Sequence, residues 1–425
     1  MSPDLGETNW SGNYVYRATE IHRPTTLDEL ITRIAAAPRI QVLGTRHSFT
    51  GIGDSEQLVS LERLPAEISF DPDAGTVSVT GQVTYAELAA ACNGAGVALA
   101  NLASLPHISL AGAVATATHG SGNELGNLAT AVRALELITS SGELLFIEQG
   151  DACFDGVVVG LGALGVVTRL TLAVQPYYEV AQRVYDELSW EMLFEHYEQI
   201  TASGDSVSLF HRFGGQIDQV WVKRRLTASQ GENAAAAELF GARRADAPRH
   251  PVLGADPVNC TAQLGAPGPW SERWPHFRSG CVPSSGEEIQ SEFFVAREDA
   301  TAAIAAITPL ADRIQPLLLV CELRTVAQDS LWLSPQYRRQ STGIHFTWRR
   351  RQPEVQRLVA EIEARLAPFA PRPHWAKLFT ARAAALAPRY ERLSDFMALR
   401  DELDPRAAFS NDWLRSRVLD VAAPS

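Results

Sequence analysis

The first part of the chain alternates between helical and strand-like hydrophobic patterns. Residues 27–34 place leucine and isoleucine at helical spacing, and Thr26 with Glu29 forms a capping-box pattern at their start. Residues 40–43 and 76–80 are short apolar or β-branched runs that predict strands. A second capping box, Thr84 to Glu87, predicts a short helix that ends near Gly94 or Gly96. This pattern is typical of a mixed α and β domain.

A hairpin and a glycine turn follow. Residues 132–139 and 143–147 are strand-like runs separated by Ser-Ser-Gly. Residues 160–165 match G-x-G-x-x-G, but the run 166–172 after them is strand-like. A nicotinamide fingerprint requires a helix at that point, whose N-terminus holds the pyrophosphate. We therefore reject that reading and expect a tight glycine turn that lies against a different cofactor.

The pattern changes near residue 176. Strand-like runs at 207–213, 219–223, 317–326 and 344–349 predict an antiparallel sheet, with helices over 297–307 and 354–366. Residues 226–285 are rich in Gly, Pro and Ala, and we expect a long excursion there. The last forty residues are again helical in pattern.

Composition excludes several classes of protein. The 425 residues are 46% hydrophobic, enough for a sizeable core, and the net charge of −12 argues against binding to nucleic acid or to an anionic membrane surface. The longest near-apolar run, 157–167, is too short to span a bilayer, and the N-terminus lacks a secretory pattern. The five cysteines are scattered, which predicts free thiols in a reducing cytoplasm and no cysteine-rich metal site.

Two segments rich in small residues are candidates for contact with a large ligand. Residues 42–49 run from an apolar strand into a glycine turn that contains His47, and such a turn can present backbone N–H groups to a pyrophosphate. Residues 104–122 are almost wholly Gly, Ala, Ser and Thr, which allows close approach of the backbone to a ligand. An ordinary loop and a tightly packed core loop are the alternatives.

Polar side chains interrupt the apolar strands of the second part. Period-two alternation places Glu322 and Arg324 on one face of the strand 317–326. It places His345 and Thr347 together on one face of the strand 344–349. Lys377, between Trp375 and Phe379, reads as a third strand-like element. One opposite-charge pair could be only a structural ion pair. Three strand-like segments, each with hydrogen-bonding side chains on one face, predict a polar pocket suited to a polyhydroxylated substrate.

At these residues the chain resembles the alditol oxidase (xylitol oxidase) branch of the vanillyl-alcohol-oxidase-type flavoproteins. The similarity extends over nearly the whole chain and is weaker around residues 226–250. The segments that carry it are 44–49, 103–109, 116–122, 162–168, 321–325, 345–348 and 372–377. Arg46 departs from the family pattern, in which a small residue is common at this position.

The resemblance implies an α+β fold with a two-subdomain FAD-binding domain and an antiparallel-sheet substrate domain. It implies that residues 1–176 bind FAD, that the tail 386–425 returns to them, and that residues 177–385 bind substrate. The flavin would be attached covalently through His47. The expected cofactor contacts are Val42, Leu43, Gly44, Thr45, Arg46, His47, Ser48, Ser104, Ser109, Gly112, Thr116, Ala117, Thr118, His119, Val167 and His374.

The resemblance also implies the reaction. An alditol such as xylitol or sorbitol would be oxidised at its terminal hydroxyl to the aldose, with hydride passing to flavin N5 and O2 reduced to H2O2. Ser104, Glu322, Arg324, Thr347 and Lys377 would bind the polyol, and His345 or Lys377 would orient or deprotonate the reacting hydroxyl. We expect no metal, no nucleic acid, no membrane partner and a monomer.

Two other functions remain open at this point. An aldonolactone oxidase or dehydrogenase of the same superfamily would share the Glu322-x-Arg324 and His374-Trp-x-Lys377 elements, whereas Ser104 and the His345-Phe-Thr347 element favour the alditol branch. A non-catalytic flavin-binding module is the second alternative. It predicts that no polyol yields peroxide.

Overall fold

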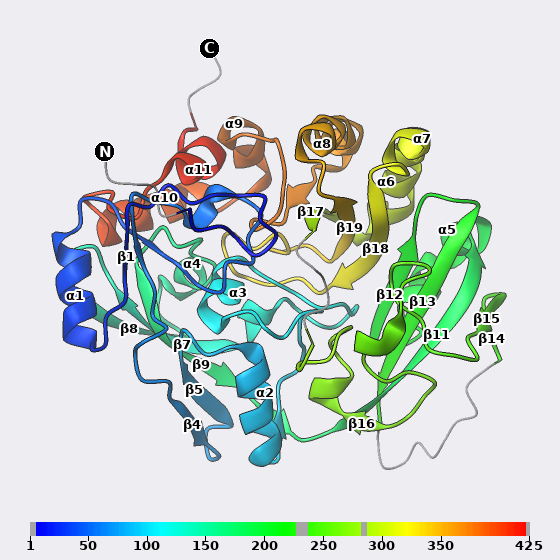
Figure 1. Ribbon diagram of the computed structural model, residues 1–425, viewed down its shortest axis with the longest axis horizontal. Helices are drawn as coiled ribbons and strands as arrows, with labels where there is room; N and C mark the ends of the chain where they lie inside the picture. Colours follow the sequence, from blue (N-terminus) through cyan, green and yellow to red (C-terminus); the bar gives the residue numbers. More distant parts are fainter. Residues whose placement is uncertain (1–5, 227–236, 282–286, 422–425) are drawn as a thin grey trace.

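Two antiparallel sheets organise the molecule. The computed structural model describes residues 6–226, 237–281 and 287–421. In Figure 1 a five-stranded sheet occupies the lower left and a ten-stranded sheet occupies the centre and right, with helices along the upper edge. The predicted α+β class is therefore confirmed.

The N-terminal elements form a small parallel sheet and one helix. The strands lie in the order β1-β3-β2, and α1 lies between β1 and β2 in sequence: β1 (Glu20–His22), α1 (Leu27–Ala36), β2 (Gln41–Val42), β3 (Gln57–Val59). Thr26 caps α1 by accepting from the Glu29 backbone N–H. The reciprocal half of the expected capping box is displaced by one residue, because the Glu29 carboxylate accepts from the Thr25 N–H at 3.0 Å.

The five-stranded sheet has the order β4-β5-β9-β7-β8. Its strands are β4 (Ile68–Asp71), β5 (Thr76–Thr80), β7 (Val132–Ile138), β8 (Leu144–Glu148) and β9 (Val166–Ala173). The predicted strand at 76–80 and the predicted hairpin are confirmed. Helix α2 (Tyr85–Gly94) begins at a complete capping box formed by Thr84 and Glu87, as expected. The glycine turn leads into β9 rather than a helix, which confirms that it is not a nicotinamide fingerprint.

The ten-stranded sheet follows the order β14-β15-β11-β13-β12-β18-β19-β17-β20, with β16 paired to β11. Its strands are β11 (Glu179–Ser189), β12 (Ser206–His211), β13 (Gln216–Arg225), β14 (Glu238–Leu239), β15 (Ala242–Arg244), β16 (Gly268–Pro269), β17 (Glu288–Ala296), β18 (Leu318–Val326), β19 (Ser341–Arg349) and β20 (Arg372–Pro373). The four predicted strands of the second part are β12, β13, β18 and β19. The expected excursion contributes only short elements within residues 237–281; residues 227–236 and 282–285 lie outside the described chain.

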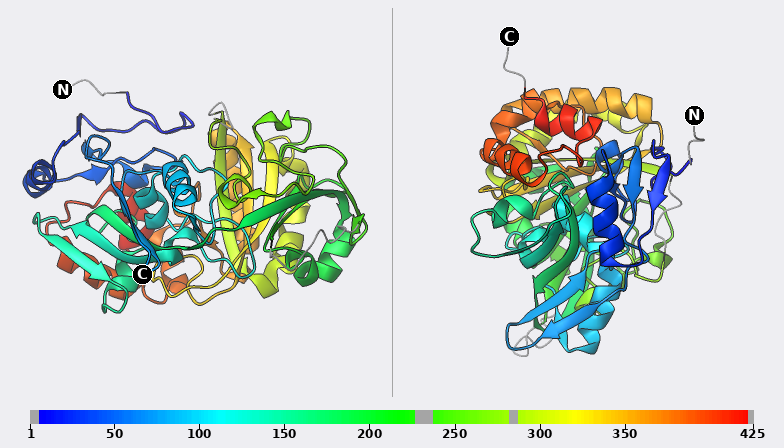
Figure 2. Two further views of the ribbon diagram at one scale, coloured as in Figure 1. Left: turned by 90° about the horizontal axis from the view of Figure 1, so that it is seen from below. Right: turned by 90° about the vertical axis from the view of Figure 1, so that its left-hand side faces the viewer.

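The ten-stranded sheet buries one face against helices. Helices α5 (Trp190–Thr201) and α6 (Ala300–Ile307) contact the sheet, and α8 (Gln352–Leu366) packs on α6 (Figure 2). Leu323 and Phe346 belong to the same buried apolar cluster as Ile304 of α6. Because side chains alternate across a strand, the neighbouring residues Glu322 and His345 point to the opposite face. The other short helices are α3 (Leu110–Ala115), α4 (Phe154–Val157), α7 (Ala311–Ile314), α9 (Ala383–Leu386), α10 (Leu393–Leu403) and α11 (Asp412–Leu414).

The C-terminal segment lies against the N-terminal elements. Phe409 shares a buried cluster with Leu30 and Ile34 of α1, and the Ala408 carbonyl accepts from the Ile40 N–H at 2.9 Å. The proposed boundary near residue 176 stays a prediction. No helix within the described ranges combines the length and the apolar character that crossing a bilayer requires.

One expected strand is wrong. Lys377 does not lie on a strand, because β20 ends at Pro373 and the Lys377 N–H donates to the His374 carbonyl at 3.0 Å in a turn. Trp375 and Phe379 pack edge to face, with ring centroids 6.2 Å apart. The Trp-Ala-Lys-Leu-Phe pattern therefore imitates a strand, while the chain turns and delivers Lys377 to the cavity.

Candidate active site

A cavity of about 730 Å³ lies among the His47 loop, the small-residue segment and the polar face of the ten-stranded sheet. Among the predicted site residues, only Ala117 is absent from its wall. The side chain of Ala117 is buried in the apolar core instead. The other predicted residues line the cavity: Val42, Leu43, Gly44, Thr45, Arg46, His47, Ser48, Ser104, Ser109, Gly112, Thr116, Thr118, His119, Val167, Glu322, Arg324, His345, Thr347, His374 and Lys377.

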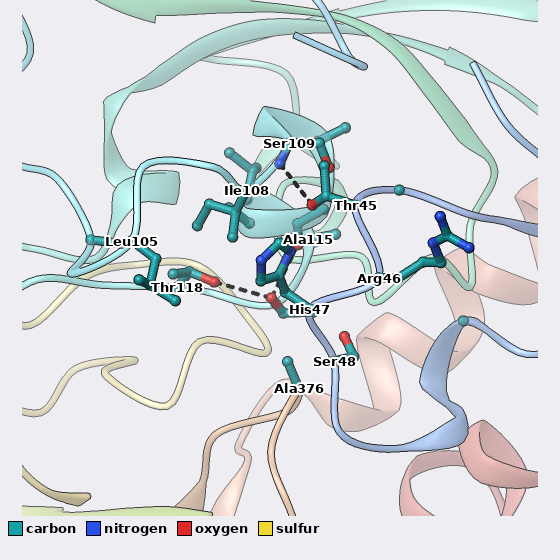
Figure 3. A pocket seen from close by; sticks show the side chains of 18 of the residues that line it. Thr45, Arg46, His47, Ser48, Leu105, Ile108, Ser109, Ala115, Thr118 and Ala376 are labelled. Carbon is teal, nitrogen blue, oxygen red and sulfur yellow. Dashed lines mark hydrogen bonds between the residues drawn. The ribbon is translucent and has the colours of Figure 1, made fainter. Parts of the chain in front are cut away.

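Close packing holds the His47 loop against the start of α3. The Ser109 N–H donates to Thr45 Oγ1 at 3.1 Å, a bond that Figure 3 marks. A Cβ at Gly44 would lie 2.8 Å from Ser109 Oγ, so any larger residue there would force the Ser109 side chain to shift. Further along, Thr116 Oγ1 lies 3.3 Å from Thr118 Oγ1. The two small-residue segments therefore form one continuous wall.

His47 presents an unpartnered nitrogen in this wall. Its Nδ1 is buried and has no hydrogen-bond partner within the described residues, and its ring stacks on Trp10 with centroids 5.5 Å apart. Burial lowers the pKa of His47 to about 4, so the ring is neutral near pH 7. The Arg46 side chain points away from His47 in Figure 3 and forms an ion pair with Glu7. The Arg46 guanidinium is therefore paired with Glu7 rather than directed at His47.

The sheet face opposite this wall carries a row of charged and polar side chains. In the register of β18, β19 and β17, Glu322 lies opposite His345, and His345 lies opposite Glu292. Burial alone would raise the pKa of both carboxyls. Arg324 is the main opposing charge, and it helps to hold both pKa values well below the usual range. The site therefore contains two ionised carboxylates within a buried row.

Arg324 reaches across one strand to join these carboxylates. Its guanidinium donates to Glu292 Oε1 at 2.9 Å, and its Nε lies 3.6 Å from Glu322 Oε2. The residue beside Arg324 on β19 is Gly343, and a Cβ there would lie 3.0 Å from Glu292 Oε1. The missing side chain at Gly343 leaves the path from β18 to β17 open. The predicted Glu322–Arg324 pair is thus part of a three-residue network.

Lys377 completes the network from the turn after β20. Its Nζ donates to Glu292 Oε2 at 2.6 Å, so Glu292 is its direct partner. Burial lowers the pKa of Lys377 despite the opposing charge of Glu292. An ammonium with a lowered pKa in a cavity can bind a hydroxyl oxygen and exchange a proton with it.

A hydrogen-bond acceptor faces each ring nitrogen of His345. Gln290 donates its amide NH2 to Glu288 Oε1 at 2.8 Å, because a carboxylate only accepts. The Gln290 carbonyl oxygen therefore faces His345 Nε2, 3.1 Å away, and Glu322 Oε2 lies 3.5 Å from His345 Nδ1. Burial lowers the pKa of His345 to about 4, so the ring is neutral near pH 7 and keeps one lone pair. This neutral ring is the proton acceptor that the site offers.

Sequence reasoning missed three residues of this site. Gln290 and Glu292 lie on β17 at period-two spacing, and that alternation was the available signal. His276 comes from the excursion after β15, where no periodicity marks it. Its Nε2 lies 2.9 Å from Glu322 Oε1, which makes His276 the nearest partner of that carboxylate.

One cluster has the composition of a metal site. His119, Glu292 and His374 place one ligand atom each within 4.8 Å of one another. Arg324 and Lys377 both contact Glu292, however, and two positive charges at the same carboxylate would repel a divalent cation. We assign no metal to this cluster.

Comparison with known proteins defines the class of this one. A model described as "FAD binding domain" matches residues 19–148, and a model described as "D-arabinono-1,4-lactone oxidase" matches residues 285–417. The crystal structure of cholesterol oxidase from B. sterolicum superposes with a TM-score of 0.78 at 13% identity, over 97% of this chain and 96% of that chain. The fold and these matches define an FAD-dependent oxidoreductase of the vanillyl-alcohol-oxidase type.

Two curated relatives narrow the assignment. An alditol oxidase from a Streptomyces species is 46% identical over 413 residues, which cover 96% of this chain and 98% of the relative. An L-gulono-1,4-lactone dehydrogenase from Mycobacterium tuberculosis is 27% identical over 97% of this chain and 98% of the relative. The chain belongs to the alditol oxidase family.

Proposed function

We propose that this protein oxidises the terminal hydroxyl group of straight-chain alditols, such as xylitol and sorbitol, to the aldose, with O2 reduced to H2O2. The observation that supports this most directly is the row of Glu322, Arg324 and His345 that lines the cavity beside the ammonium of Lys377. An open-chain polyol has a hydroxyl on each carbon. A row of acceptors and donors can hydrogen-bond several of these hydroxyls, and its buried groups would be left unpaired when a smaller alcohol binds.

The cavity wall fits FAD. His47 Nδ1 is a buried nitrogen without a partner among the residues that the structure describes, and the segments around Gly44 and Gly112 bring backbone close to the cavity. When bound, FAD supplies the acceptor for the hydride and passes the electrons to O2. Residues 42–48, Ser109 and the segment from Thr116 to His119 would hold it.

The protein residues supply binding and proton transfer. Glu322 accepts hydrogen bonds from substrate hydroxyls, while Arg324, Thr347 and Ser104 complete the binding site. The neutral imidazole of His345 takes the proton of the reacting hydroxyl as the hydride leaves its carbon. Lys377 donates to the oxygen of the same hydroxyl and orients it.

Xylitol and sorbitol are expected to reduce the bound flavin. The measurement is anaerobic bleaching of the flavin absorbance with xylitol, sorbitol and L-gulono-1,4-lactone as separate additions, followed by peroxide assay after air is admitted. Bleaching by both alditols, with peroxide afterwards, supports the proposal. Failure of both alditols would refute it, and bleaching by the lactone alone would favour the lactone-oxidising alternative.

A specific observation keeps that alternative in view. The family model over residues 285–417 is described as a D-arabinono-1,4-lactone oxidase, and this segment contains Glu322, Arg324, His345 and Lys377. The 46% identity to an alditol oxidase, against 27% to the lactone dehydrogenase, favours the alditol reading. A non-catalytic flavin-binding module would show no bleaching with any of the three compounds. The cytoplasmic location and the monomeric state stay predictions from sequence.

We expect the flavin to be bonded covalently to His47. Its Nδ1 is buried, neutral and unpartnered, which suits a nitrogen that forms a bond to the flavin 8α-methyl carbon. After acid precipitation of the wild-type protein, the yellow colour should stay in the pellet. His47→Ala should release all of it to the supernatant, whereas His107→Ala, a change at another histidine of the cavity wall, should keep it in the pellet. A colourless wild-type pellet would refute the linkage.

A further inference from the structure

The chain has two lysines among its 37 basic residues, Lys223 and Lys377. Lys223 is buried beside the cavity and Lys377 lines it, while the other 35 are arginines. A lysine offers three compact donors on one nitrogen, whereas arginine presents a planar fork. Lys377 contacts Glu292 and belongs to the proposed site. Lys223 has no role in the proposed reaction, and its position therefore requires a separate explanation.

Lys223 lies on β13 with 1% of its surface exposed. Its Nζ donates to the Trp274 carbonyl at 2.6 Å and to the Pro275 carbonyl at 3.3 Å, and it lies 3.2 Å from His276 Nδ1. No side-chain carboxylate is recorded within ion-pair distance of Lys223 in the described chain, although a buried ammonium is costly without compensation. All three of its N–H groups are instead used by one short stretch of the excursion.

Lys223, His276 and Glu322 form a hydrogen-bonded path, and the direction of its bonds is set at both ends. The Lys223 ammonium only donates, so His276 Nδ1 accepts. The proton of neutral His276 is then on Nε2, which donates to Glu322 Oε1 at 2.9 Å. Glu322 is ionised and only accepts, which agrees with the same direction. A neutral amine at Lys223 could accept from His276 Nδ1–H instead, but that arrangement would turn a lone pair of Nε2 toward the carboxylate.

Burial and the charge of Glu322 act in opposite directions on the Lys223 ammonium. Burial lowers the pKa of Lys223 to about 7, and the Glu322 carboxylate opposes that shift. Burial and the Lys223 charge lower the pKa of His276 to about 4, so the imidazole is neutral near pH 7. Thr261 steadies the stretch, because its Oγ1 donates to the Pro275 carbonyl at 2.8 Å.

We propose that Lys223 is a positioning residue for polyol binding, which acts by holding His276 in the Nε2–H tautomer and thereby orienting the Glu322 carboxylate. His276 occupies Oε1 of Glu322, whereas the contacts at Oε2 are longer, at 3.5 Å to His345 and 3.6 Å to Arg324. Oε2 therefore retains acceptor capacity for substrate hydroxyls. This inference rests on the proposed function, since it assigns the substrate contact to Glu322.

The first test reads the tautomer without any substrate. In protein labelled with [15N]histidine, two-bond proton–nitrogen correlations distinguish the protonated from the unprotonated ring nitrogen, and the His276 signal is identified by its loss in His276→Gln. We expect an unprotonated Nδ1 in the wild-type protein and a mixture of tautomers, or a protonated Nδ1, in Lys223→Met. A protonated Nδ1 in the wild type, or the same pure Nε2–H tautomer in Lys223→Met, would overturn the proposal.

The second test separates positioning from general stability. Lys223→Met should raise the polyol concentration that gives half-maximal flavin reduction about tenfold, the loss of one hydrogen bond, and change the limiting rate less than twofold. His276→Gln should stay close to the wild type, because its amide can accept from Lys223 and donate to Glu322. His276→Leu should match Lys223→Met and provides the test if Lys223→Met does not fold.

A double-mutant cycle tests whether Lys223 acts through Glu322. Where Glu322→Gln is already present, Lys223→Met should add less than a twofold effect on polyol binding, because the two residues act through one contact. An additive tenfold loss would show that Lys223 affects polyol binding independently of Glu322 and would overturn the proposal. If no polyol reduces the wild-type flavin, the proposed function fails, and the tautomer measurement still decides the arrangement of Lys223 and His276.

Discussion

Arg324→Ala is expected to abolish measurable flavin reduction by polyols and to lower the free energy of unfolding by about 3–5 kcal/mol, the cost of breaking a buried ion pair. Arg324 is the cation that lies between Glu292 and Glu322, and both carboxylates are almost wholly buried. Without it, two negative charges face one another across a single strand, and Lys377 alone remains to offset Glu292. The measurements are anaerobic flavin reduction and chemical unfolding.

The pairwise contributions can be separated by double-mutant cycles. Arg324→Ala combined with Glu292→Gln, and separately with Glu322→Gln, should each give losses well below the sum of the single variants. The coupling should be larger for Glu292, whose Oε1 lies 2.9 Å from the guanidinium, than for Glu322, at 3.6 Å. Additive losses in both cycles would show that the three residues act independently. Arg324→Lys keeps the charge and tests whether simultaneous contact of the guanidinium with Glu292 and Glu322 is required.

Lys377→Met is expected to slow anaerobic flavin reduction about ten- to a hundredfold, which corresponds to one lost contact of roughly 1–3 kcal/mol at the reacting hydroxyl. The methionine keeps the length of the side chain and removes the ammonium. Glu292 still has Arg324 as its partner, so the fold should survive. The flavin should stay in the acid pellet, because His47 is unchanged.

The matched control for this variant is Lys223→Met, the same substitution at the other lysine. It should mainly weaken polyol binding, whereas Lys377→Met should mainly lower the limiting rate of reduction. A wild-type limiting rate in Lys377→Met would remove Lys377 from the catalytic residues. His345 would then be the remaining candidate base.

Local patterns in the sequence were sufficient for much of the fold. Thr84 and Glu87 form the expected capping box because both partners lie within one helical turn. The strands that contain Glu322 and His345 were predictable because an apolar face alternates with a polar one along each. Alternation imitated a strand around Lys377, however, since the side chains of a turn can also divide between two sides.

The sequence by itself determined which strand faces carry polar groups. It also determined which segments are rich enough in small residues to lie close to a large cofactor. Only the tertiary structure decided the partners within the site. Glu292 meets Arg324 because β17 and β18 flank the same strand, β19. His276 reaches Glu322, 46 residues further along the chain, because a non-periodic excursion folds back over the sheet. Short-range periodicity specifies the orientation of a side chain, whereas the pairing of buried charges depends on strand order and loop closure over long distances.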